Sequence, residues 1–260
     1  MPFGVGIGQV VAVVRDARGF ERHVARVALA GPRARELAAA LAAGGDPGAV
    51  AVEGDPAAAA AAVRIVDGAP TEADVAFLRR AARAGVPLLV VVGREGRPRT
   101  GSASRIPYVL PQDTIELDGD GSLAERVARS LARAVGGGDA AALARRLPAL
   151  RPHVEHRLVR RAALAGAAVA AAPWVEEAHL PLLTLAQARM LLELGVAAGS
   201  TLPRDPQALA TAAGPAVAAS FGTGLALRSL YRRLPVRGPL AAAALAYAGT
   251  RALGELRTRV

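Results

Sequence analysis

The 260-residue chain contains no cysteine, and only 3% of its residues are aromatic. Without cysteine it has no disulfides, thiolate metal sites or cysteine nucleophiles. With so few aromatic side chains, a core must be packed from Ala, Val and Leu, and the hydrophobic content of 52% is ample for this. The start of the chain lacks a basic segment followed by a long apolar one. We therefore identify no signal peptide and expect the protein on the cytoplasmic side.

Lysine and asparagine are also absent, so all 32 basic residues are arginine, and the net charge is +10. Residues 1–148 hold 19 Arg against 16 acidic residues, whereas residues 149–260 hold 13 Arg against 6. The more apolar half is thus the more basic one, which suits an anionic membrane surface or a polar protein partner. A genome rich in G and C explains the arginine excess equally well. The arginines are not interleaved with aromatics, which disfavours nucleic acid as a partner.

The first half of the chain alternates short apolar strands with helices. We expect strands within 24–31, 49–54, 63–68, 87–93 and 114–117, and helices over 33–44, 71–85 and 122–138. Thr71 with Asp74 predicts a helix N-terminus, and Ser122 with Glu125 predicts a capping box. This alternation indicates βαβ units and a parallel sheet covered on both faces, so we expect an α/β domain over 1–148.

The second half has no strand pattern and predicts an all-α helical domain over 149–260. Its segment Ala208–Leu227 holds twenty residues without a charge, about the length that crosses a bilayer core. It is mostly Ala and Gly, and Gly214-Pro215 would kink or break a helix. We expect either a marginal membrane helix or a pair of short buried helices. Because 162–175 and 240–250 are shorter, we favour a compact bundle that docks on or dips into the membrane.

Arginines border the apolar segments of this half, as they do at the cytoplasmic face of a membrane. A helical bundle with charged residues facing water is the alternative. The residues that we expect to contact a membrane or a protein partner are Arg157, Arg160, Arg161, Trp174, Arg228, Arg232, Arg233 and Arg237.

The segment VRIVDGAPTEADVAFLRRAARAGVPLLVVVGREG resembles the second half of an Era-type GTPase domain, and the resemblance extends over about residues 24–136. It implies a P-loop-GTPase-like fold and places VALAGPRARELAAAL at the first strand, phosphate loop and first helix. Such a loop needs glycines that direct N–H groups at phosphates and a lysine that reaches the β and γ oxygens. Here Pro32 has no N–H, and the chain has no lysine.

The base-reading N-K-x-D of that family is replaced by Gly93-Arg94-Glu95-Gly96. The resemblance therefore implies a degenerate domain that has lost its nucleotide, and we expect no cofactor. Gly31, Arg33 and Arg35 are what is left of a phosphate site.

The segments HLPLLTLAQARMLLELGVAAG and RSLYRRLPVRGPLAAAALAYAGTRALGE resemble the helical domain of unknown function in YcjF-like membrane-associated bacterial proteins. The resemblance implies association with the inner face of a membrane and brings no catalytic residues. The matching positions include Pro181, Gln187, Met190, Gly199, Pro235, Tyr247, Thr250 and Gly254.

Other candidate sites are weaker. His153, His156 and His179 lack a fixed set of metal ligands, so we expect solvated histidines and no metal site. A catalytic pair of Asp67 with Glu95 is disfavoured, and we find no catalytic constellation. The sequence thus favours a non-enzymatic, membrane-associated scaffold or regulatory protein. A nucleotide hydrolase that uses Arg33 or Arg35 in place of lysine and a soluble adaptor that buries a partner subunit are the alternatives.

Overall fold

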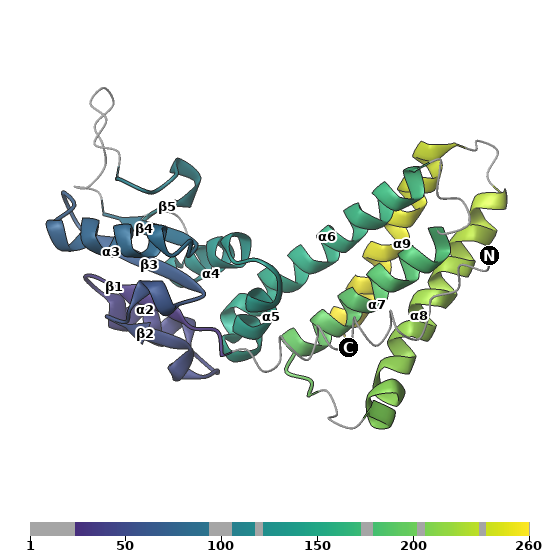
Figure 1. Cartoon of the computed structure of the whole chain (residues 1–260), viewed down its shortest axis with the longest axis horizontal. Coiled ribbons are helices and arrows are strands. Elements are labelled where there is room, and N and C mark those ends of the chain that lie inside the picture. Colours follow the sequence, from purple (N-terminus) through teal and green to yellow (C-terminus); the bar gives the residue numbers. More distant parts are fainter. Residues whose placement is uncertain are drawn as a thin grey trace. The chain divides into compact units, whose positions relative to one another are not determined.

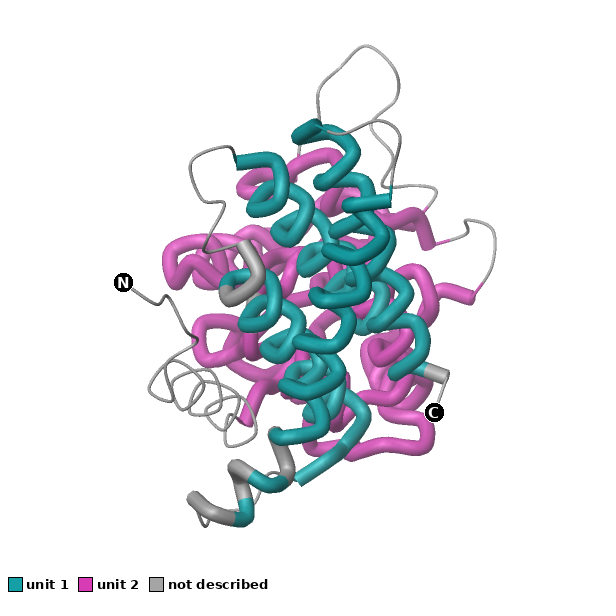
Figure 2. Tube along the Cα trace, turned by 90° about the vertical axis from the view of Figure 1, so that its right-hand side faces the viewer, with its two compact units in different colours: residues 1–22, 155–260 teal, residues 23–154 magenta. Residues whose placement is uncertain are grey.

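The structure is a computed structural model that describes residues 24–93, 106–117, 122–172, 179–201, 206–233 and 238–259. The chain divides into two compact units, which Figure 2 shows in different colours. The α/β unit covers His23–Val154, and the helical unit contains Glu155–Val260. The expected boundary at residue 148 thus lies a few residues before the division between the units, which falls inside helix α6 (Arg151–Ala171).

A five-stranded sheet forms the centre of the α/β unit (Figure 1). All neighbouring strands are parallel, in the order β2-β1-β3-β4-β5. The central strands are almost entirely buried, as expected for a parallel sheet covered on both faces. The prediction of an α/β domain with a parallel sheet is therefore confirmed. The strands are β1 (Val27–Ala30), β2 (Val50–Val52), β3 (Ala61–Val66), β4 (Leu88–Val92) and β5 (Thr114–Glu116).

Helices cover both faces of this sheet. Phe77, Leu78 and Ala81 of α3 (Glu72–Arg83) pack against alternate residues of β1, β3 and β4. Because successive strand residues point to opposite faces, Leu29 and Ile65 point to the other face. There α2 (Ala34–Leu41) and α4 (Leu123–Ala134) contact each other as well as the strands.

The two predicted helix starts differ in outcome. At α3 the Thr71 hydroxyl accepts the Asp74 N–H at 3.3 Å, and the Asp74 carboxylate accepts the Thr71 N–H at 2.7 Å, so a full capping box forms. At α4 the predicted box is wrong, because the Ser122 side chain makes no capping bond. Glu125 instead accepts a bond from Arg129 at 2.7 Å, one helical turn along α4.

A helix was not expected after the glycines near residue 136, but α5 (Gly137–Arg146) begins there. Its last residue anchors distant parts of the α/β unit. The Arg146 guanidinium donates to the Asp46 carboxylate at 2.8 Å and to the Ala25 carbonyl at 2.6 Å. The bond from Arg146, with that from the Gly48 N–H, lowers the pKa of Asp46 below its ordinary value.

The helical unit contains the rest of α6 with α7 (His179–Ala197), α8 (Pro206–Arg233) and α9 (Pro239–Arg259). Ala208–Leu227 lies within the single helix α8, so the expected pair of short helices is wrong. Pro215 interrupts only its own hydrogen bond, and α8 continues along α7, its main contact. None of the helices, over the residues that the structure describes, combines the length and apolarity needed to cross a bilayer.

Glycines bring the helices of this unit close together at particular points. A Cβ atom at Gly254 of α9 would lie 2.5 Å from Cγ2 of Val159 on α6, and one at Gly166 of α6 would lie 2.9 Å from Leu183 of α7. Gly199, one of the positions that match the YcjF-like pattern, has a different role. Gly199 has φ +96° and ends α7 in a Schellman motif, with its N–H bonded to the Val196 carbonyl at 3.0 Å.

Candidate functional site

The strand order places a candidate site where the chain direction across the sheet reverses, between β1 and β3. Open α/β sheets bind ligands outside the carboxyl ends of their strands at such a point. The loop Gly31–Arg33 follows β1 there, and Asp67 follows β3. Gly31 and Arg33 of this loop belong to the predicted remnant of a phosphate site, together with Arg35.

Gly31 is held in a conformation that other residues rarely adopt. Its φ is +111°, and a Cβ atom would lie 2.1 Å from the Ile65 carbonyl oxygen of β3. The Gly31 N–H donates to the Glu53 carboxylate at 3.1 Å, while the Glu53 N–H donates to the Leu29 carbonyl at 2.8 Å. A carboxylate of the chain itself thus occupies the Gly31 amide, which would otherwise be available to a phosphate.

Arg33 in this loop and Arg35 in the first turn of α2 do not create an anion site. Arg33 lies at the N-cap of α2 with φ 59°, so the helix begins at Ala34, one residue after the expected start at residue 33. The Arg33 guanidinium binds both oxygens of Glu36, each at 2.9 Å, and this contact lowers the pKa of Glu36. Arg35 is exposed. With Glu53 and Glu36 beside the loop, a phosphate would meet negative charge.

The carboxylate most enclosed by the α/β unit has a structural partner. Asp74 is buried and binds the Arg64 guanidinium at 2.5 Å in addition to capping α3. Burial raises its pKa, but the bonds from Thr71 and Arg64 outweigh this and hold the pKa below its ordinary value. An ionised, fully bonded carboxylate is not available as a general base.

The positions that resemble the YcjF-like pattern lie mainly in the core of the helical unit. Gln187 of α7 donates to the Thr250 hydroxyl of α9 at 2.8 Å, and both side chains are fully buried. Met190 is buried on the same helix as Gln187, and Gly254 faces α6. These residues therefore hold helices together and do not form a surface site. Tyr247 is half-buried beside Arg251.

The arginines that the sequence placed together fall into two separate groups. Arg157, Arg160 and Arg161 lie near the middle of α6, where burial, and then the charge of Arg161, lower the pKa of Arg157. Arg228 and Arg232 of α8 instead line a cavity together with Val169–Ala172 at the end of α6. At a rise of about 1.5 Å per residue, the groups are roughly 15 Å apart along α6.

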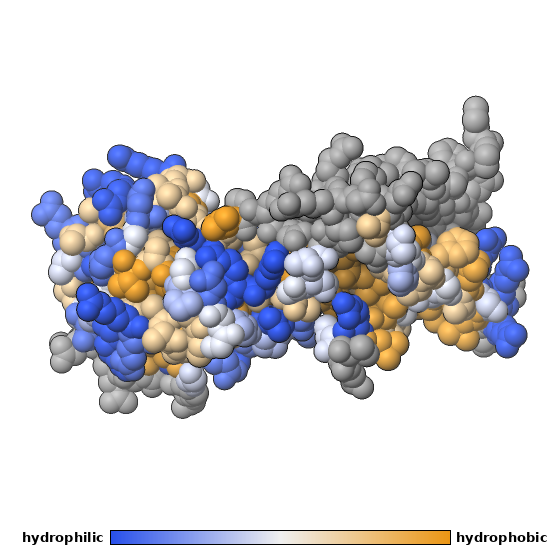
Figure 3. Space-filling model, turned by 90° about the horizontal axis from the view of Figure 1, so that it is seen from below, coloured by the Kyte–Doolittle hydropathy of each residue, from blue (hydrophilic) through white to orange (hydrophobic). Residues whose placement is uncertain are grey.

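The outer side of α8 carries a stripe of residues spaced by four, three and four positions. It consists of Phe221, Leu225, Arg228 and Arg232, which share one helix face. Phe221 and Leu225 are 47% and 45% exposed. We call these four residues the α8 stripe. In the face shown in Figure 3, hydrophobic residues gather over the helical unit with charged residues beside them.

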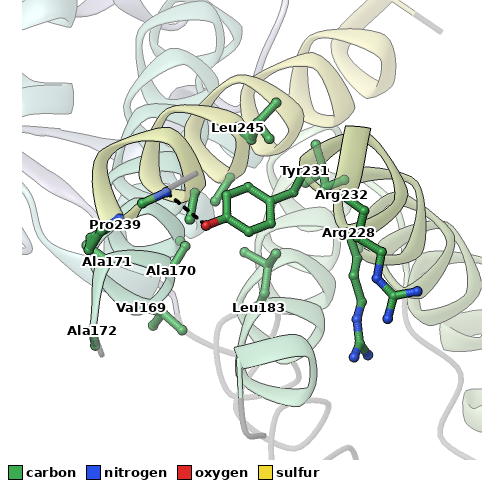
Figure 4. Close-up of a pocket in the computed structure, with 16 residues that line it drawn as sticks. Val169, Ala170, Ala171, Ala172, Leu183, Arg228, Tyr231, Arg232, Pro239 and Leu245 are labelled. Carbon is green, nitrogen blue, oxygen red and sulfur yellow. Dashed lines mark hydrogen bonds between the residues drawn. The ribbon is translucent and has the colours of Figure 1, made fainter. Parts of the chain in front are cut away.

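A cavity of about 610 Å³ lies between α6, α7, α8 and α9. Its wall is mostly Ala, Gly, Leu and Val, and the ring of Tyr231 projects into it (Figure 4). The Tyr231 hydroxyl accepts the Gly238 N–H at 3.0 Å, which connects the end of α8 to the start of α9. Arg228 and Arg232 extend to the same side of α8. The cavity therefore has an apolar interior and a basic border.

Some predicted residues lie outside what the structure describes. These are Trp174, Pro235, Arg237 and Glu95, and the side chain of Pro181. Within the described ranges, no group of three His, Asp or Glu side chains could hold a metal ion.

Comparison with family models, curated proteins and solved structures finds no match for this chain. The resemblances to the Era-type and YcjF-like families therefore remain predictions that rest on the sequence alone. Sequence reasoning missed Glu53 and the cavity. The sequence offered one indication that Glu53 contacts the loop at Gly31, namely its position directly after the short strand β2. A cavity wall that is rich in Ala and Gly has no sequence signature.

Proposed function

We propose that this protein is a non-enzymatic, membrane-associated scaffold or regulatory protein on the cytoplasmic face of the cell membrane. In it the helical unit binds an anionic lipid surface, and the α/β unit, a P-loop-GTPase-like fold without its nucleotide, serves as a platform for protein contacts. The observation that carries the proposal is the α8 stripe, because two large exposed apolar side chains are followed on the same face by two arginines. An interfacial helix combines these features.

The α/β unit supports the non-enzymatic part of the proposal. The Gly31 amide is already bonded to Glu53, and Arg33 is already paired with Glu36. Lysine and asparagine, which phosphate and guanine recognition in this fold require, are missing from the chain.

Vesicle flotation of the full chain tests the membrane part. We expect flotation with vesicles containing phosphatidylglycerol and much less with phosphatidylcholine alone, because each arginine near an anionic surface contributes about 1 kcal/mol. The double substitution Phe221→Ser/Leu225→Ser should weaken binding about tenfold or more through lost apolar burial. Leu256→Ser removes an even more exposed apolar side chain from α9 and serves as the control. Equal losses in both variants would contradict the role of the α8 stripe.

Thermal unfolding with GTP or ATP and Mg²⁺ tests the non-enzymatic part. We expect no shift of Tm with either nucleotide. Arg83 is another exposed arginine of the α/β unit, so Arg83→Ala serves as the control. A Tm shift that is lost in Arg35→Ala but kept in Arg83→Ala would favour the nucleotide hydrolase instead. A stable soluble complex with a second protein, without flotation, would favour the adaptor.

A further inference from the structure

We propose that the cavity of the helical unit is a lipid site that holds an acyl chain of an anionic phospholipid, with Arg228 and Arg232 at its headgroup. This inference deepens the proposed function and rests on it. It assigns the membrane contact a defined ligand and a defined site.

The size and wall of the cavity suit an acyl chain. Its volume of about 610 Å³ lies within the range of roughly 300–1,000 Å³ typical of small-molecule sites. Leu183, Leu227 and Leu245 from three helices line it together with small residues. The hydroxyl oxygen of Tyr231 accepts the Gly238 N–H, which holds the ring with its apolar surface in the cavity. An apolar chain could cover this wall without breaking the bond between Gly238 and Tyr231.

The positive charge at the border of the cavity favours a lipid with an anionic headgroup. Arg228 and Arg232 are one turn apart on α8, an arrangement in which like charges repel. Across the described part of the chain, no acidic side chain forms an ion pair with Arg228. A phosphate beside Arg228 would accept paired hydrogen bonds from its guanidinium group and would place a negative charge near Arg232.

The position of the cavity connects it to a membrane surface. Arg228 and Arg232 belong both to its lining and to the α8 stripe. A lipid whose headgroup lies at these arginines would therefore extend its chain inward from the face that carries Phe221 and Leu225.

The test measures binding of a single lipid without a membrane. We would titrate the full chain with dihexanoyl phosphatidylglycerol below its micellar concentration by calorimetry, and with dihexanoyl phosphatidylcholine as the neutral comparison. We expect one molecule of the anionic lipid per chain and at least tenfold weaker binding of the zwitterionic one.

Two matched pairs of variants locate the site. Ala242→Phe fills the cavity and should reduce binding at least tenfold, whereas Ala244→Phe adds the same ring at an exposed position of α9 and should leave it unchanged. Arg228→Gln should weaken the binding of the anionic lipid and leave that of the zwitterionic lipid unchanged. Arg233 is an exposed arginine outside the cavity lining, so Arg233→Gln should change neither. Because Arg228 is exposed, its variant remains informative even where Ala242→Phe fails to fold.

The outcomes separate this inference from the proposed function. A wild-type chain that floats with anionic vesicles but does not bind the short lipid overturns the cavity site and leaves membrane association standing. A chain that binds the short lipid but does not float supports the cavity site and overturns membrane association. Unchanged binding in both Ala242→Phe and Arg228→Gln also overturns the cavity site.

Discussion

The contact between Gly254 of α9 and Val159 of α6 allows a quantitative test of how the helical unit is packed. A Cβ atom at Gly254 would lie 2.5 and 2.7 Å from the two γ-carbons of Val159 and 3.1 Å from its Cβ. Valine is β-branched and cannot rotate away easily. Overpacking of this kind costs about 1–3 kcal/mol, while alanine gains about 0.5–1 kcal/mol over glycine in a helix. The difference between the two effects spans about 0–2.5 kcal/mol, so we expect Gly254→Ala to lower the free energy of unfolding by about 1 kcal/mol.

Gly222→Ala is the matched control, because a Cβ atom at Gly222 of α8 meets nothing within 4 Å. It should raise the free energy of unfolding by about 0.5–1 kcal/mol, the opposite sign. Urea unfolding followed by helical circular dichroism and by the fluorescence of Trp174, the only tryptophan of the chain, measures both. Adding Val159→Ala should recover part of the Gly254→Ala loss, with a coupling of about 1 kcal/mol. A Gly254→Ala variant as stable as Gly222→Ala would refute the packing described here.

Two further predictions concern buried polar groups. Asp74→Asn should lower stability at pH 7 by about 2–4 kcal/mol, because it breaks the pair with Arg64 and weakens the capping box. The folded-state pKa of Asp74 is lowered below its ordinary value of 3.8. Its contribution to the free energy of unfolding is therefore fully present above pH 3.8 and is lost as the pH falls through the folded-state pKa. The penalty measured by urea unfolding should therefore shrink towards pH 2, and a constant penalty would contradict the assignment. Thr250→Val should lower the free energy of unfolding by about 1–3 kcal/mol, because it leaves the Gln187 amide unpaired. Adding Gln187→Leu should restore part of this loss. Additive losses in the double variant would show that the bond is not formed.

The elements that the sequence predicted correctly are those whose signals are local. The apolar runs of β3 and β4 and the Thr71–Asp74 pair each occupy a few consecutive residues, so periodicity and capping rules identify them. The Ser122–Glu125 pair has the same local pattern, but Arg129 one turn away competes for the Glu125 carboxylate. A local rule does not include that competitor.

The features that the sequence did not predict depend on residues far apart in the chain. The bond between Glu53 and the Gly31 amide joins loops after two different strands. Arg146 joins Asp46 and Ala25, which lie 100 and 121 residues earlier in the chain. The cavity arises where four helices with small side chains meet, and no single segment encodes it. The continuity of α8 through Pro215 likewise depends on its packing along α7.

The most direct test of membrane association is fractionation of cells that express the full chain. We expect the protein to sediment with membranes at low salt, to be partly released by high salt that screens the arginines, and to be fully released by alkaline carbonate. The Phe221→Ser/Leu225→Ser variant should remain in the soluble fraction. A wild-type protein that stays soluble at low salt would contradict the account, and one that resists carbonate would show that its helices insert.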